Sequence, residues 1–259
     1  MNSGDPWRAL RGLRIGCVQY LNSRPLICAY DGAVVFDHPS SLARMLAAGE
    51  LDAALVPVFE AVRDPRYLLV DDVAVACDGP VFSVFLAHRG ELRDVRSVAL
   101  DPASLSSANL LRVLLVEFHD LRPAFGGSGE ARLLIGNQAI EFRRAEEGKS
   151  GWQFLDLGAE WKRCTGLPFV FAVWAVRAAT ADAPAVADAF RRLKDAGLAQ
   201  IPELIARENF GDEEMRRRYL TECLRFDIGP RGREALALYR ALLAKHRLIA
   251  GHSAPLEFI

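Results

Sequence analysis

The stretch Arg14-Ile-Gly-Cys-Val-Gln-Tyr-Leu-Asn-Ser-Arg-Pro-Leu26 decides which fold the sequence predicts. It begins as an apolar run typical of a buried strand and then turns polar at Tyr20 and Asn22. Pro25 presets φ for the first turn of a following helix. Ligands of open α/β sheets bind at the carboxyl ends of strands. We therefore expect Tyr20 and Asn22 to face a small-molecule pocket.

The segments that follow repeat this alternation of strand and helix. Residues 33–36 read as a short strand, and residues 42–46 carry apolar side chains at helical spacing behind Ser40 or Ser41 as the N-cap. Residues 51–56 read as the next strand. Together these segments form a βαβαβ unit, which implies parallel pairing of its strands.

Composition excludes several classes of protein. The chain has 259 residues, of which 51% are hydrophobic and 25% charged, so it can build a sizeable core and is not a disordered chain. Its 32 basic residues balance 33 acidic ones, and no basic stripe indicates a nucleic-acid partner. The five cysteines are odd in number and show no metal-ligand spacing, so we expect no metal site and reduced thiols.

The sequence also predicts where the protein works. Residues 1–12 contain no apolar segment of the kind that a signal peptide needs. The longest uninterrupted apolar run, Phe169 to Val176, is less than half the length of a membrane span. We therefore expect a cytoplasmic protein with no membrane partner, and the sequence leaves a homodimer open.

Serines gather in front of a helix in the middle of the chain. Residues 98–100 read as a strand, and Ser104, Ser106 and Ser107 precede a helix expected over 110–118. One serine would be a plain N-cap, but three of them with the free N–H groups of the first turn suit a carboxylate. Simple capping and ordinary loop composition are the alternatives.

Two further strands carry polar residues toward the same region. Ser83 interrupts a long apolar strand predicted over 79–87, so its hydroxyl either bonds to backbone or faces a cleft. Residues 132–137 read as a strand that ends in Gly136 and Asn137. Both of these residues therefore come at a carboxyl end and join the candidate site.

The order of these elements predicts two lobes. We expect residues 12–86 and 172–259 to form the first lobe and 87–171 the second, after an N-terminal tail at 1–11. The chain reads as helical from Asp182 onward. This is the plan of an α/β, two-lobed fold of the type II periplasmic-binding-protein-like kind with a helical C-terminal segment. Its cleft would collect Tyr20, Asn22, Ser83, Ser106, Ser107 and Asn137.

The sequence resembles the chorismate dehydratases of the futalosine route to menaquinone. The opening block, with Tyr20-Leu-Asn22, is the most specific part of the resemblance, which runs from about residue 14 to 176 in the family's order. The helical tail matches only in kind. The other matching blocks are Leu51–Pro57, Gly79–Val84, Val98–Ser104, Leu134–Gly136, Asp156–Gly158 with Trp161, and Thr165–Ala172.

Two positions depart from the family's pattern. The family usually has Ser-Arg-Thr-Ser before the helix of the second lobe and an aspartate after Ile-Gly. Here Leu105 replaces the arginine and Asn137 replaces the aspartate. Losing the arginine removes a carboxylate partner worth roughly 1.5–3 kcal/mol in a charge-assisted bond. Either an ion pair has been lost as a unit, or the substrate preference has moved.

The resemblance implies elimination of water from chorismate to give 3-[(1-carboxyvinyl)oxy]benzoate, with no cofactor. It makes Asn22 the catalytic residue, which polarises the departing C4 hydroxyl or holds a carboxylate. Ser106 and Ser107 would bind a carboxylate with the helix N-terminus, and Ser83 and Tyr20 would orient the ring. The remaining expected substrate-binding residues are Ser104, Gly136 and Asn137.

Two alternatives remain at this stage. A cytosolic protein of the same fold could bind a small carboxylate without turning it over, although such receptors are normally exported. The sibling enzyme of the pathway, which makes 1,4-dihydroxy-6-naphthoate, shares the fold but does not open with the Tyr20-Leu-Asn22 pattern.

Overall fold

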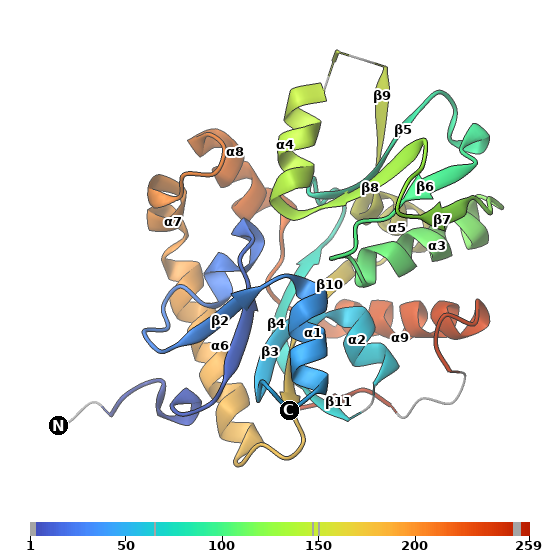
Figure 1. Ribbon diagram of the computed structural model, residues 1–259. Coiled ribbons are helices and arrows are strands. Elements are labelled where there is room, and N and C mark those ends of the chain that lie inside the picture. Colours follow the sequence, from blue (N-terminus) through green and yellow to red (C-terminus); the bar gives the residue numbers. More distant parts are fainter. Residues whose placement is uncertain (1–3, 65, 147, 150, 251–254) are drawn as a thin grey trace.

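Two β-sheets, stacked one above the other in Figure 1, organise the molecule. The structure is a computed structural model that describes residues 4–64, 66–146, 148–149, 151–250 and 255–259. The first sheet has the strand order β11-β4-β10-β3-β1-β2 and the second has the order β7-β6-β8-β5-β9.

The first sheet begins with the stretch quoted above. Its strands are β1 (Ile15–Val18), β2 (Val34–Asp37), β3 (Ala53–Pro57), β4 (Tyr67–Cys77), β10 (Phe169–Arg177) and β11 (Glu257–Phe258). Strand β1 pairs in parallel with both β2 and β3, which confirms the predicted βαβαβ unit. Strand β10 returns antiparallel between β3 and β4, so the chain comes back to this sheet after building the second one.

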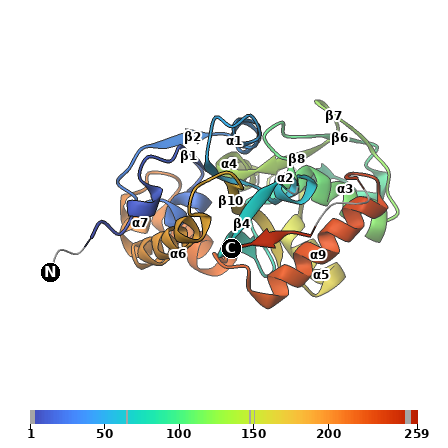
Figure 2. The same cartoon turned by 90° about the horizontal axis from the view of Figure 1, so that it is seen from below.

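Helices cover the first sheet and carry the chain away from it. They are α1 (Pro39–Ala47), α2 (Val58–Arg63), α6 (Ala183–Ala199), α7 (Ile201–Arg207), α8 (Glu213–Arg218) and α9 (Gly229–Lys245). Helix α1 packs on β1 and β3, α6 packs on β4, and α9 packs on β10 and reaches α3 of the other half (Figure 2). Short helical turns form at η1 (Arg8–Leu10), η2 (Leu21–Leu26), η3 (Leu92–Asp94) and η4 (Tyr219–Cys223).

The second sheet is built from the middle of the chain. Its strands are β5 (Val84–Arg89), β6 (Ser97–Ala99), β7 (Ala124–Gly126), β8 (Ala131–Ile135) and β9 (Trp152–Asp156). Helices α3 (Ser106–Phe118), α4 (Gly136–Glu146) and α5 (Leu157–Thr165) pack against it. The predicted lobe boundaries at 86/87 and 171/172 stay a prediction, while β5 lies wholly in the second sheet and β10 wholly in the first.

Three local predictions were wrong. The strand expected over 79–87 begins only at Val84, so Ser83 lies in the segment that crosses between the sheets. The helix expected from Leu110 begins at Ser106. Neither Ser40 nor Ser41 caps α1, because His38 is the N-cap residue and Pro39 already occupies the first turn.

The crossing segment in front of β5 is fixed by one carboxylate. Asp156 caps α5 by accepting from the N–H groups of Gly158 and Ala159, both at 3.0 Å. The same carboxylate accepts from the N–H groups of Val81 at 3.0 Å and Phe82 at 2.7 Å. Four backbone donors on one buried carboxylate hold the crossing segment, and therefore Ser83, in a single conformation.

Two general findings concern the described part of the chain. No helix within it is both long and apolar enough to cross a membrane, and it brings no group of three or more His, Cys, Asp or Glu together as a metal would need. All five cysteines are free thiols.

Candidate active site

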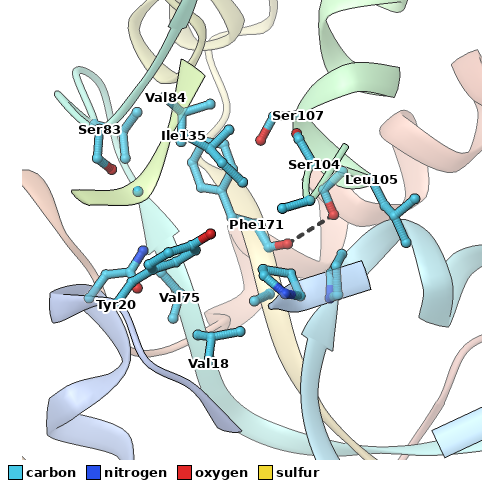
Figure 3. Close-up of a pocket in the computed structure, with 18 of the residues that line it drawn as sticks. Val18, Tyr20, Val75, Ser83, Val84, Ser104, Leu105, Ser107, Ile135 and Phe171 are labelled. Atoms are coloured by element: carbon cyan, nitrogen blue, oxygen red, sulfur yellow. Dashed lines mark hydrogen bonds between the residues drawn. The ribbon is translucent and has the colours of Figure 1, made fainter. Parts of the chain in front are cut away.

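A pocket lies between the two sheets, where β1, β3, β4 and β10 meet the loop before α3 (Figure 3). It encloses about 590 Å³, part of which opens to solvent, and this size suits a small ligand. Figure 3 shows Tyr20 and Val18 approaching from one side and Ser83, Ile135 and Ser107 from the other. The other lining residues are Asn22, Pro39, Leu55, Pro57, Val75, Val81, Val84, Ala103, Ser104, Leu105, Ser106, Gly136, Phe171 and Ala172.

The structure thus brings together seven of the eight site residues expected from the sequence. Asn137 is the exception, because it lines a wider outer cleft that also contains Gln19, His38, Asp101 and Arg132. Tyr20 lines both spaces and so stands between the inner pocket and the outer cleft. The roles predicted for these residues stay predictions.

Gly136 gives Tyr20 its place. The backbone of Gly136 has φ +65°, and a Cβ added there would come within 3.0 Å of the Tyr20 ring at Cε2. Glycine is therefore required both for the left-handed backbone and for the close approach of the ring. Burial, and to a smaller extent the nearby charge of Asp101, raises the pKa of Tyr20 to about 12, so its phenol stays protonated.

Asn22 presents an unpaired oxygen at the pocket. Its Oδ1 is buried and finds no hydrogen-bond partner within the described part of the chain. Its side chain forms a hydrogen bond with the hydroxyl of Tyr219, a residue of η4. A buried acceptor without a donor is costly, so a ligand that donates to Oδ1 gains that free energy on binding.

Ser83 shares the same tyrosine. The hydroxyl of Tyr219 donates to Ser83 Oγ at 2.7 Å, and both side chains are buried. The sequence-based choice for Ser83 lay between a backbone bond and a cleft position. The structure places it at the pocket with a tyrosine side chain as its partner.

The three serines before α3 have different surroundings. Ser106 Oγ accepts from the N–H of Phe59 at 3.1 Å and donates to the carbonyl of Phe171 at 3.0 Å, the bond drawn in Figure 3. Its hydroxyl therefore ties α2 and β10 together. Ser104 Oγ is buried without a partner in the described residues, and Figure 3 shows the hydroxyl of Ser107 directed into the pocket.

The two positions that depart from the resembled family lie in different places. Leu105 lines the inner pocket at the N-cap position of α3, where it adds an apolar wall. Asn137 Oδ1 accepts from the backbone N–H of Leu21 at 3.2 Å, in the outer cleft. The two side chains therefore line separate spaces, and none of the inner-pocket residues carries a formal charge.

Tyr219 is the contact that sequence reasoning missed. It was read as part of an apolar helical stripe with Met215 and Leu220, and its ring is indeed buried. Nothing in a single sequence distinguishes a core tyrosine from one whose hydroxyl reaches a site 197 positions away at Asn22. Val75 and Phe171, which form the floor of the pocket, were missed because β4 was not predicted.

Relatives of known name resemble this chain in sequence. It is 32% identical to the chorismate dehydratase of Thermus thermophilus over 227 residues, which cover 77% of this chain and 82% of that protein. It is 28% identical over 155 residues to the chorismate dehydratase of Campylobacter jejuni, covering 59% of this chain and 58% of that protein.

Solved structures agree on the fold. A protein from Archaeoglobus fulgidus has a TM-score of 0.72 at 17% identity, covering 92% of this chain and 98% of that one. The periplasmic aliphatic sulphonate binding protein of Escherichia coli has a TM-score of 0.56 at 13% identity, covering 92% and 88%. These likenesses confirm the predicted two-lobed, periplasmic-binding-protein-like fold. The sequence also matches the family described as menaquinone biosynthesis over residues 13–245, and the chain belongs to that family.

Proposed function

We propose that this protein is a chorismate dehydratase, which eliminates water from chorismate to give 3-[(1-carboxyvinyl)oxy]benzoate. The observation that carries the proposal is the buried, unpaired Oδ1 of Asn22 at a pocket with no charged lining. The relationship to two chorismate dehydratases supports the choice of substrate. The free cysteines accord with a reducing compartment, and we propose the cytoplasm.

The reaction asks for little chemical power. The C4–O bond breaks, the proton on C3 is lost, and the electron pair of the C3–H bond enters the ring, which becomes aromatic. The hydroxyl and the proton leave as water. Because aromatisation drives the reaction, holding the substrate in the reactive geometry supplies much of the acceleration, up to about 7–11 kcal/mol in favourable cases.

The start of α3 is our proposed site for one substrate carboxylate. The helix has 13 residues, and its first N–H groups have no partners within the helix. Ser104 adds a buried hydroxyl without a partner, and Ser107 lines the same wall. Ser106, in contrast, supports this wall through its bonds to Phe59 and Phe171 rather than binding substrate.

For Asn22 we propose contact with the C4 hydroxyl. Its amide nitrogen is engaged by Tyr219, so the atom left for the pocket is the Oδ1 acceptor. An acceptor oxygen suits a hydroxyl donor and would repel a carboxylate. Of the two roles expected for Asn22, this arrangement favours the hydroxyl over the carboxylate.

The proton acceptor is proposed to be the substrate itself. The lining of the inner pocket contains no Asp, Glu, His or Lys, and the pKa of Tyr20 is raised to about 12. The carboxylate of the enolpyruvyl group is a base that arrives with the substrate and lies close to C3 in its own molecule. This leaves to the protein the tasks of orientation and exclusion of water.

Incubation with chorismate tests the proposal. We expect the purified protein to form a product with benzoate-type ultraviolet absorption, and Asn22→Ala to lower turnover by about 100-fold because the reacting bond is misplaced. Asn209→Ala, on an exposed residue far along the chain, is the control and should keep normal activity.

Binding without turnover would favour a receptor for small carboxylates, and near-normal turnover in Asn22→Ala would refute the assignment of that residue.

A further inference from the structure

Tyr219 lies behind the wall of the pocket that Asn22 and Ser83 form. Its side chain is 2% exposed and does not line the inner pocket, yet its hydroxyl contacts both neighbours. It belongs to η4, one turn of π-helix that follows α8. The helical C-terminal part of the chain therefore contributes directly to the surroundings of the site.

The hydrogen bonds at Tyr219 have a defined direction. A tyrosine hydroxyl has one hydrogen to donate, and here it goes to Ser83 Oγ at 2.7 Å. The Tyr219 oxygen can then only accept, and the amide N–H of Asn22 supplies that bond. This fixes the orientation of the Asn22 amide and leaves its Oδ1 unpaired.

Two ends of this chain of bonds remain open toward the pocket. Ser83 receives a hydrogen bond from Tyr219, and no acceptor in the described part of the protein takes the hydrogen of its own hydroxyl. Asn22 Oδ1 lacks a donor. One open end needs an acceptor and the other a donor, and a single hydroxyl group satisfies both.

We propose that Tyr219 is a positioning residue that orients a ring of hydrogen bonds completed by the substrate hydroxyl. The ring runs from the Asn22 amide to Tyr219, on to Ser83, then to the C4 oxygen of the substrate and back to Asn22 Oδ1. This inference rests on the proposed function.

Hydrogen bonds that run in one direction polarise one another, so the bond from Tyr219 makes Ser83 a stronger donor to the departing oxygen. Burial raises the pKa of Tyr219 far above its usual range, although its hydrogen bonds with Ser83 and Asn22 lower it. The hydroxyl therefore remains protonated and keeps its direction throughout the working pH range. The surrounding crossing segment is held by Asp156 and cannot easily rearrange.

Tyr219→Phe removes the hydroxyl and keeps the buried ring. We expect kcat for chorismate to fall about 10- to 100-fold, the range expected for one or two lost buried hydrogen bonds, and KM to stay within about three-fold. Tyr67→Phe is the matched control, because Tyr67 is also buried and its hydroxyl donates to Glu60 at 3.5 Å, away from the pocket. It should leave both constants unchanged.

A second readout does not depend on turnover. The chain has five asparagines, so protein labelled only at asparagine gives few side-chain amide signals in a nitrogen–proton spectrum. The Asn22 amide should be protected from hydrogen exchange in the wild type and in Ser83→Ala, and lose protection in Tyr219→Phe. Ser83→Ala should nevertheless lower kcat, since it removes the donor to the substrate.

The outcomes separate the two proposals. Wild-type protein that does not convert chorismate overturns the proposed function, and the ring is then judged by the amide signal. A Tyr219→Phe variant with normal kcat, or with an Asn22 amide as protected as in the wild type, overturns the role of Tyr219.

Discussion

The side-chain oxygen of Asn137 accepts a hydrogen bond from the backbone N–H of Leu21 at 3.2 Å. Asn137 lies in the first turn of α4, in the half of the molecule built on the second sheet. Leu21 directly follows Tyr20 in the half built on the first sheet. This bond therefore holds the loop that carries Tyr20 and Asn22 against the opposite side of the pocket.

Replacing Asn137 tests this connection. Asn137→Ala should raise KM for chorismate about five-fold, because a neutral hydrogen bond contributes about 1 kcal/mol. Asn137→Asp keeps an acceptor and should stay within about two-fold of the wild type, as steady-state kinetics would show. Gln138→Ala is the control, since the Gln138 amide bonds to Asp101 in the same half of the molecule. Equal KM values in all three variants would contradict the link.

Gly136→Ala should displace the ring of Tyr20. The added Cβ would lie 3.0 Å from Cε2 of that ring, on a backbone already at φ +65°. Gly90→Ala is an unusually close control, because Gly90 has the same φ with nothing within 4 Å of the added Cβ. Both variants should lose about 1 kcal/mol of unfolding free energy from backbone strain. Only Gly136→Ala should also lose activity, and a matching loss in Gly90→Ala would refute the role of this contact.

Two neighbouring serines should respond in opposite ways to alanine substitution. Ser106→Ala leaves the Phe59 N–H and the Phe171 carbonyl without their partner and should cost about 1–3 kcal/mol of unfolding free energy. Ser104→Ala removes a buried hydroxyl that has no partner in the described residues, so stability should be unchanged or slightly raised.

Chorismate binding should nevertheless weaken in Ser104→Ala if this hydroxyl meets the substrate carboxylate. Denaturant titrations give the two stabilities, and a KM measurement gives the affinity. A stability loss in Ser104→Ala with unchanged KM would assign that hydroxyl a structural role.

Glu160 should give the fold a dependence on acidity. Burial raises its pKa, but hydrogen bonds with Arg163 and His119 lower it, and the net pKa is below the usual 4.5. A carboxylate whose pKa is lower in the folded state stabilises the protein above the unfolded pKa, and this contribution is lost as the pH falls.

Glu160→Gln should therefore be less stable than the wild type at pH 7, and the gap should narrow below about pH 4.5. Unfolding free energies measured across this range check the prediction. Exposed Glu203 provides the control through Glu203→Gln, which should show no such narrowing. A gap independent of pH would mean that the charge of Glu160 is not what stabilises the fold.

The local signals of the sequence were sufficient for the opening βαβαβ unit and for the polar residues at the ends of its strands. Strand β4 escaped prediction for a physical reason. Asp71 and Asp72 interrupt its apolar pattern, and Asp72 has φ +61° where the pairing with β10 shifts register. Strand β11 depends on pairing with Leu68 and Leu69 far earlier in the chain, which no local pattern encodes.

The candidate site shows the same division between local and distant information. Sequence reasoning could place polar residues near one another because parallel strands share a carboxyl edge. It could not tell that the Ser106 hydroxyl is already bonded while that of Ser104 is not, because the difference depends on Phe59 and Phe171. Nor could it find Tyr219, whose buried ring obeys the ordinary rule for a core residue.

The position of Tyr219 in the chain has a consequence for biosynthesis. Its partner Ser83 lies 136 residues earlier, and Asn22 is earlier still. A ribosome releases both halves of the pocket wall well before it releases η4. The nascent chain therefore cannot orient Asn22 until synthesis is almost finished, and such long-range closure is intrinsically slow. Activity should consequently appear late and abruptly as chain length grows, rather than in step with the formation of the two sheets.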